Sequence, residues 1–171
     1  GKTSVKEMLR AILVAEAGED AVLATAGNLN NDIGVPLTLL RLRGAHRFAV
    51  IEMGMNHPGE IRYLASLARA DAVAINNAQR AHAGHFASVA DIARAKGELF
   101  ESLPAGVTAC VNLDDAYAGL WQTLAGDARQ IGFGWSQGEV RVTDCQLHSD
   151  RVALTLATPL GPIATEIPAP G

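Results

Sequence analysis

Cysteine is nearly absent from this 171-residue chain. Cys110 and Cys145 lie far apart, without the paired spacing of a zinc site or a redox motif. A disulfide framework is therefore excluded as a source of stability, and we expect the protein to work in a reducing cytoplasm.

The chain also lacks an excess of positive charge and long hydrophobic runs. Its 14 Lys and Arg residues stand against 18 Asp and Glu residues, a formal net charge of -4, so no basic field is present to hold a nucleic-acid backbone. No apolar run approaches the roughly 20 residues of a membrane span, and the first residues do not follow the order of a signal peptide. The sequence therefore predicts a soluble protein that binds neither nucleic acid nor membrane.

What the chain has is enough apolar sequence, 49% of its residues, to bury one substantial core. Strand-like and helix-like segments alternate along its first 134 residues. We expect helices at about 3–16, 36–43, 58–69, 88–103 and 116–124, and strands at about 21–25, 48–53, 72–76, 107–112 and 130–133. Parallel strands need crossover connections, so this order predicts an α/β fold with a mostly parallel sheet and helices on both faces.

The pattern changes after Gly134. Strands at about 140–147, 151–157 and 163–167 follow one another without helices, which predicts a small antiparallel β appendage. We therefore expect one domain over residues 1–171 with two sub-lobes, a parallel α/β core at 1–134 and a small antiparallel sheet at 135–171.

Polar side chains follow the predicted strands of the core. Glycine, Asn and Asp residues fill the loop 27–32, Glu52 ends the second strand, and Asn76 and Asn77 end the third, with His82 shortly after. Asp114 and Asp115 follow the fourth strand, where they are also suited to capping the next helix. Such residues are ordinary in turns. Because ligands of open parallel sheets bind at the carboxyl ends of the strands, their recurrence at that edge predicts a binding site there.

The tripeptide Gly1-Lys2-Thr3 opens the first predicted helix. It matches the last third of a phosphate-binding loop, in which backbone amides and the lysine hold phosphates and the threonine binds magnesium. The glycine-rich first half is absent, so we expect a chain truncated within that loop. By itself the tripeptide is equally compatible with an ordinary helix start.

Lysine is scarce, with three residues against eleven arginines, and one of the three occupies an unusual place. Lys96 falls in the middle of an apolar stripe when the helix at 88–103 is projected at about 100° per residue. The stripe consists of Val89, Ile92, Ala93, Phe100 and Leu103. Either the lysine stem packs and its ammonium escapes to solvent, or the amine is desolvated and open to reaction or modification.

Four strings of residues, taken together, resemble the central domain of the Mur ligases. The resemblance covers the whole chain and is strongest before about Asp115. Within the family it is closest to the members that add D-alanyl-D-alanine to UDP-MurNAc-tripeptide. The strings are Gly1-Lys2-Thr3-Ser4-Val5-Lys6-Glu7-Met8, Gly27-Asn28-Leu29-Asn30-Asn31-Asp32-Ile33-Gly34-Val35-Pro36, Glu52-Met53-Gly54-Met55-Asn56-His57-Pro58-Gly59-Glu60 and Ala95-Lys96-Gly97-Glu98-Leu99-Phe100.

The resemblance implies an ATP-dependent carbon–nitrogen ligase of peptidoglycan synthesis. ATP phosphorylates the terminal carboxylate of the tripeptide, and the amine of D-alanyl-D-alanine attacks the acyl phosphate. A carboxylate resists amines until one oxygen becomes a leaving group, and the phosphoryl transfer needs cations and a dry site. The family's amino-terminal domain, which binds the UDP-sugar, and its carboxy-terminal domain are both absent here. We therefore expect the fragment alone to be inactive.

The resemblance also implies roles for single residues. Gly1, Lys2 and Thr3 bind the phosphates of ATP, and Lys2 takes part in catalysis. Thr3 and Glu52 hold a first Mg²⁺, while His82 reaches a second. Lys96 matches the family's carbamylated lysine, a carbon dioxide adduct that makes the ammonium an anionic oxygen ligand for magnesium. The nucleotide or the reacting carboxylate is lined by four amides, Asn28, Asn31, Asn76 and Asn77.

Alternatives remain at this point. A sister amide ligase, either the Mur ligase that adds the third peptide residue or a folylpolyglutamate synthase-like enzyme, shares the loop, Glu52 and Lys96, but the string 27–36 favours the D-alanyl-D-alanine branch. A phosphate-loop kinase or ATPase and a noncatalytic nucleotide-binding module are the other classes. The chain also departs from the family after His82, where Ala83-Gly84-His85-Phe86 replaces the usual Leu-Glu-Gly-Phe, so His85 is a second candidate ligand.

Overall fold

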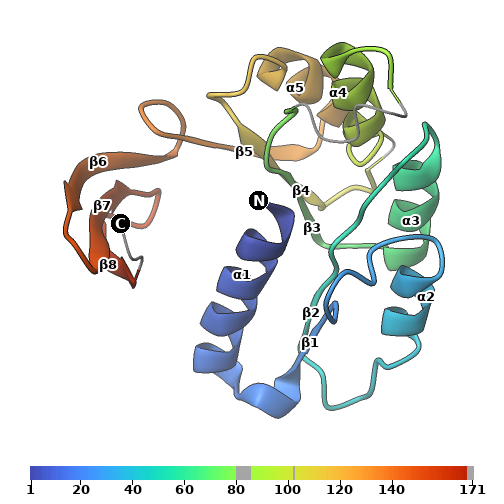
Figure 1. Ribbon diagram of the computed structural model, residues 1–171, viewed down its shortest axis with the longest axis horizontal. Helices are drawn as coiled ribbons and strands as arrows, with labels where there is room; N and C mark the ends of the chain where they lie inside the picture. Colours follow the sequence, from blue (N-terminus) through green and yellow to red (C-terminus); the bar gives the residue numbers. More distant parts are fainter. Residues whose placement is uncertain (80–85, 102, 169–171) are drawn as a thin grey trace. The chain divides into compact units, whose positions relative to one another are not determined.

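The computed structural model describes residues 1–79, 86–101 and 103–168. Its chain divides into two compact units (Figure 1). Unit 1 comprises Gly1–Ala70 and Gln79–Leu99, and unit 2 comprises Asp71–Ala78 and Phe100–Gly171. None of the described helices is long and apolar enough to cross a membrane.

Unit 1 holds a short parallel sheet and most of the helices. Strands β1 and β2 pair in parallel, with Val22 opposite Phe48 and Ala24 opposite Val50. Helix α1 packs against both strands, α2 packs against α3, and α3 packs against α4. The elements are α1 (Lys2–Ala17), the 3-10 helix η1 (Glu19–Ala21), β1 (Val22–Ala24), α2 (Gly34–Leu39), β2 (Phe48–Val50), α3 (Glu60–Ala68) and α4 (Val89–Gly97).

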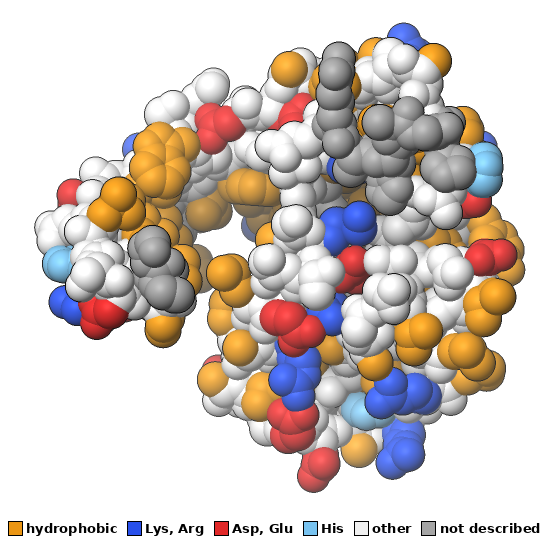
Figure 2. Space-filling view, in the orientation of Figure 1, with side chains coloured by type: hydrophobic (Ala, Val, Ile, Leu, Met, Phe, Trp, Pro, Cys, Tyr) orange, Lys and Arg blue, Asp and Glu red, His pale blue; other side chains and the backbone are white. Residues whose placement is uncertain are grey.

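Helix α1 is present where the sequence predicts a helix, but its apolar residues do not all lie on a buried face. Much of its apolar stripe is exposed, including Val5, Met8 and Ile12, which are 46%, 49% and 65% exposed. Hydrophobic surface is accordingly visible along this helix (Figure 2). The residue of α1 that is buried is a cation, Lys6. The inward face of α1 therefore serves a polar contact as well as packing.

Unit 2 is built on a six-stranded sheet in the order β3-β4-β5-β6-β7-β8. The pairs from β3 to β6 are parallel, and β6, β7 and β8 pair antiparallel. Trp121 of α5 and Val111 of β4 are almost fully buried. The elements are β3 (Ala72–Ile75), β4 (Thr108–Asn112), α5 (Ala118–Ala125), β5 (Arg129–Gly134), β6 (Val140–Leu147), β7 (Arg151–Ala157) and β8 (Ile163–Pro168).

The α/β class with a parallel-dominated sheet is thus confirmed, as is the antiparallel pairing of the last three strands. That appendage is continuous with the parallel sheet, because Phe133 of β5 pairs with Val140 of β6. The limits of the domain and of its two sub-lobes remain predictions.

Several elements are shorter than the sequence predicts, among them β1, α2 and α3, and the reason is clearest for β2 and α4. Strand β2 ends at Val50 instead of Met53, because the amide of Glu52 donates to the side-chain Oγ1 of Thr25 (2.9 Å) and so leaves the backbone ladder. Helix α4 ends at Gly97 instead of Leu103. A glycine weakens a helix by about 1 kcal/mol relative to alanine, and the chain continues in turns up to Glu101. The helical projection that placed Phe100 and Leu103 on the apolar stripe was therefore wrong, because both residues lie beyond the end of α4.

Gly34 gives a direct test of the packing around the loop 27–32. It is buried at the start of α2, and an added Cβ would overlap the backbone of Leu29. We expect Gly34→Ala to lower the free energy of unfolding by at least about 2 kcal/mol, because backbone atoms have to move. Urea unfolding measures the change. Gly119→Ala in α5 is the control, since an added Cβ there meets no described atom within 4 Å; equal destabilisation of both variants would contradict the packing described.

Candidate functional site at the carboxyl ends of β1 and β2

Glu52 is the central side chain at the ends of the two parallel strands of unit 1. It is buried, with 7% of its surface exposed. Its Oε1 accepts a hydrogen bond from Nδ2 of Asn30 at 2.7 Å. Its Oε2 is buried and has no hydrogen-bond partner among the described residues. A buried carboxylate oxygen without a donor is costly, and a divalent cation would relieve that cost, so this oxygen fits a metal ligand.

The loop after β1 is locked to the segment after β2 by Asn30. The amide of Gly54 donates to the Asn30 carbonyl at 2.7 Å. A Cβ on Gly54 would lie 2.7 Å from Oδ1 of Asn30, so the glycine permits this close approach. The backbone and the side chain of Asn30 thus both fix the carboxylate of Glu52 relative to the loop.

The same loop is also held by Lys6 of α1. The ammonium of Lys6 donates to the Thr25 carbonyl at 2.8 Å and lies 3.5 Å from the Gly27 carbonyl. Thr25 in turn receives the amide of Glu52 on its hydroxyl. Lys6, Thr25 and Glu52 therefore form one continuous set of buried polar contacts.

Glu98 connects the helix that carries Lys96 to the start of α3. Its buried carboxylate accepts the amides of Gly59 at 2.7 Å and of Arg62 at 3.2 Å. These amides belong to the N-cap residue and the first turn of α3, where a negative charge is also favoured by the helix dipole. Around this link the apolar cluster of Met55, Ile61, Ile92 and Ala95 packs α3 against α4. The helix bearing Lys96 is therefore fixed to the segment that follows Glu52.

The model of the Mur ligase middle domain matches residues 1–171. The chain belongs to the Mur ligase middle-domain family. It is 44% identical over 173 residues to the UDP-N-acetylmuramoyl-tripeptide--D-alanyl-D-alanine ligase of Escherichia coli, covering 100% of this chain and 38% of that protein. It therefore spans less than two-fifths of the length of this relative.

Two solved structures of MurF are also similar to this chain. A crystal structure of MurF from Acinetobacter baumannii superposes with a TM-score of 0.93 at 36% identity, covering 100% of this chain and 37% of that one. MurF from Thermotoga maritima in complex with ADP has a TM-score of 0.82 at 23% identity, covering 97% of this chain and 38% of that one. The latter likeness establishes the shared fold alone.

The four strings typical of this Mur ligase domain all contribute to unit 1, and three polar links join them. Lys6 joins the first string to the second through the Gly27 carbonyl, Asn30 joins the second to the third, and Glu98 joins the third to the fourth. Lys6, Asn30 and Glu98 had no assigned role in the sequence prediction, although each lies inside a quoted string. The only feature of the sequence that marked these residues was their place inside a string resembling the family. Local periodicity does not identify the partner of a polar side chain.

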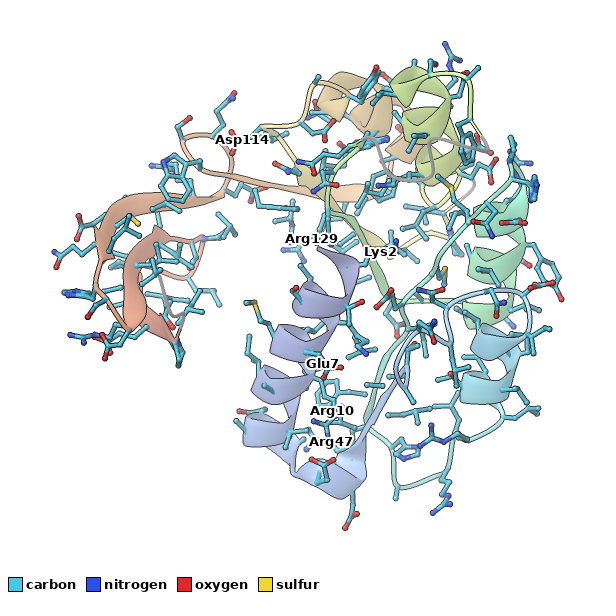
Figure 3. All side chains as sticks on the ribbon, in the orientation of Figure 1. Lys2, Glu7, Arg10, Arg47, Asp114 and Arg129 are labelled. Carbon is cyan, nitrogen blue, oxygen red and sulfur yellow. The ribbon has the colours of Figure 1, made fainter. Side chains whose placement is uncertain are left out.

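The predicted phosphate-binding residues lie at the start of α1. Gly1 is its N-cap residue, Lys2 is half-buried and Thr3 is exposed in its first turn. Figure 3 shows Lys2 at the amino-terminal end of this helix, with Glu7 and Arg10 further along it. The helix start that the tripeptide predicts is confirmed, and its phosphate-binding role remains a prediction.

The predicted metal ligands are only partly described. Lys96 is half-buried in α4, within the same unit as Glu52 and Thr3. His82 and the alternative His85 lie outside the described residues. Among residues 1–79, 86–101 and 103–168 no three His, Cys, Asp or Glu side chains gather as a metal site. The predicted set draws instead on Thr3 and Lys96, which are of other types.

The four predicted amides have different surroundings. Asn28 is exposed, and Asn31 uses its Oδ1 to accept the amide of Gly34 at 2.8 Å, which orders the start of α2. Asn76 and Asn77 are half-buried at the end of β3 in unit 2. The carbonyl of Asn76 accepts Nδ2 of Asn112 at 2.8 Å.

Asp114 and Asp115, which follow β4, accept backbone hydrogen bonds within unit 2. Asp115 accepts the amide of Tyr117 at 2.9 Å and the amide of Ala78 at 2.7 Å. The N-cap residue of α5 is Tyr117 and the helix has no side-chain cap hydrogen bond, so the expected capping by Asp114 or Asp115 is not observed. Asp114 accepts the amide of Trp135. These carboxylates therefore tie together the chain beyond β3, β4 and β5.

A pH-dependent contribution to stability comes from Glu60, the first residue of α3. The backbone hydrogen bond from Asn56 lowers the pKa of Glu60 from its ordinary 4.5, assisted by the side chain and amide of His57. The folded-state pKa lies below the unfolded one, so this stabilisation is complete above the unfolded pKa and is lost as the pH falls through the folded pKa. We expect Glu60→Gln to lower stability at neutral pH and not in acid, as measured by urea unfolding across that range. A deficit that persists unchanged in acid would contradict this.

Proposed function

We propose that this chain is the ATP-binding central part of a bacterial cytoplasmic ligase that joins D-alanyl-D-alanine to UDP-MurNAc-tripeptide through an acyl phosphate. The observation that carries the proposal is the buried, unpartnered Oε2 of Glu52 at the end of β2. It lies in a chain 44% identical to an enzyme with that name. The reaction belongs to peptidoglycan precursor synthesis.

The residues of unit 1 fit a magnesium–nucleotide site. Lys2 would bind the β- and γ-phosphates together with the amides at the start of α1, where the helix dipole favours anions. Thr3 and Glu52 would hold the first Mg²⁺, and His82 and a carbamylated Lys96 would contribute the other ligands. The bound cations would neutralise charge on the transferred phosphoryl group. The links through Asn30 and Glu98 keep Glu52 and α4 in place while the substrates bind.

Carbamylation of Lys96 is proposed on chemical grounds. An ammonium repels Mg²⁺, whereas a carbamate offers the anionic oxygen that magnesium prefers. The lysine occupies α4 among the buried neighbours Ile92, Ala93 and Ala95, so its surroundings are partly desolvated. Carbon dioxide adds to the uncharged form of a lysine amine.

The complete site is proposed to need partners outside these residues. The relatives are more than twice as long as this chain, and the family's amino- and carboxy-terminal domains are proposed to bind the UDP-sugar and to complete the ATP and dipeptide sites. Asn28, Asn31, Asn76 and Asn77 are proposed to line the nucleotide or the reacting carboxylate.

Phosphate release in the presence of ATP, Mg²⁺, UDP-MurNAc-tripeptide and D-alanyl-D-alanine tests the proposal. We expect turnover from the full-length protein that contains this chain and none from residues 1–171 alone. UDP-MurNAc-dipeptide with a single amino acid, and a folate with glutamate, are the control substrate pairs for the sister ligases. Turnover with a control substrate and none with the dipeptide would reject the proposed specificity. Robust turnover by residues 1–171 would reject the need for the other domains.

A further inference from the structure

Lys6 is a buried cation that the proposed chemistry leaves without a task. Its side chain is 3% exposed, although lysine is almost never fully buried unless it is paired. It follows Lys2 by one turn of α1, so the two lysines share a face of the helix. Burial at that position has to be balanced by specific contacts.

The ammonium of Lys6 contacts two backbone carbonyls and one carboxylate. It donates to the carbonyl of Thr25 at 2.8 Å, lies 3.5 Å from the carbonyl of Gly27, and lies 2.7 Å from Oε1 of Glu7. Glu7 is 56% exposed, so that ion pair contributes little to stability. The two carbonyls are the contacts that reach inward.

Thr25 transmits the position of Lys6 to the candidate metal ligand. Its carbonyl receives the ammonium, its amide donates to the Val50 carbonyl at 3.0 Å, and its hydroxyl accepts the amide of Glu52. Thr25 is itself 2% exposed, so little free space is available for it to shift. Displacing its carbonyl therefore displaces the backbone of Glu52.

We propose that Lys6 is a positioning residue for the magnesium site. Its ammonium fixes the end of β1 and so sets where the carboxylate of Glu52 meets the cation. The inference rests on the proposed function. A lysine suits this role because its compact ammonium can donate to both carbonyls from one position. The planar guanidinium of arginine needs more room and a different geometry.

The experiment compares Lys6→Met, Lys6→Arg and Glu7→Gln in the full-length ligase. Lys6→Met keeps the length of the side chain and removes the donors. We expect it to raise the Mg²⁺ concentration for half-maximal activity by about 10- to 100-fold, the range for residues that orient metal ligands, with the KM for D-alanyl-D-alanine unchanged. Lys6→Arg should restore part of the loss. Glu7→Gln, which keeps both carbonyl contacts, should behave like the wild type.

Thermal unfolding and calorimetric titration with Mg²⁺ and ADP complete the test. An unchanged Mg²⁺ requirement in folded Lys6→Met protein overturns the proposal, as does an equal effect of Glu7→Gln. If Lys6→Met does not fold, the Mg²⁺ requirement of Lys6→Gln is measured instead and judged in the same way. If no Lys6 variant folds, the role of the residue is structural and the proposal is overturned. A wild-type ligase that binds Mg²⁺ and ADP but does not use D-alanyl-D-alanine would reject the proposed function and leave the Lys6 comparison intact.

Discussion

Replacing Lys96 by alanine is expected to abolish ligation by the full-length enzyme. The loss should exceed about 100-fold in kcat, the upper range for residues that only orient metal ligands, because the variant lacks the proposed ligand itself. Folding should be retained, since Lys96 is half-buried and α4 is held to α3 by Glu98. Phosphate release and thermal unfolding measure the two effects.

Bicarbonate separates a carbamate from an ordinary ammonium at this position. Wild-type enzyme depleted of carbon dioxide should lose activity and regain it when bicarbonate is added, and Lys96→Ala should not respond. Arg94→Ala, at an exposed cation of the same helix, is the matched control and should retain activity. Full activity of Lys96→Ala would remove the carbamate from the mechanism.

Glu52→Gln is expected to separate activity from stability. The glutamine can still accept the hydrogen bond from Asn30, but it places a neutral amide where the unpartnered Oε2 lies. Ligation should fall by more than about 100-fold, again beyond the range for residues that orient a metal ligand. The free energy of unfolding, measured without Mg²⁺, should be unchanged or higher, because an uncompensated buried charge is removed.

The control for Glu52→Gln is Glu16→Gln on the exposed surface of α1. It removes the same charge from the same unit and should change neither ligation nor the free energy of unfolding. A Glu52→Gln enzyme that ligates normally would contradict the assignment of Glu52 as a metal ligand. A variant that loses activity only because it unfolds would contradict it equally.

Much of the fold could be predicted from the sequence because its information is local. Alternation of apolar residues gave strands β6 and β7 with the bounds that the structure has, 140–147 and 151–157. Strand β2 and helix α4 were predicted too long, since their ends are set by the side chain of Thr25 and by Gly97. A helical projection cannot reveal such contacts.

The candidate site was predictable in part for the same reason. Glu52 was placed at the binding edge by the end of a predicted strand, a local property, and its role as a metal ligand was predicted from the resemblance to the family. The roles of Lys6, Asn30 and Glu98 depend on partners 19, 22 and 39 residues away. Asn30 was passed over in favour of Asn28 and Asn31, because neighbouring amides in one loop are alike until the backbone direction is known.

A crystal structure of the full-length protein with Mg²⁺, a nonhydrolysable ATP analogue and bicarbonate would show whether Glu52 and Lys96 hold the metal. We expect magnesium at about 2.0–2.1 Å from an oxygen of Glu52, with a carbamate on Lys96 among the ligands of the magnesium site. A metal bound elsewhere, with Oε2 of Glu52 unliganded and Lys96 unmodified in solvent, would contradict this expectation.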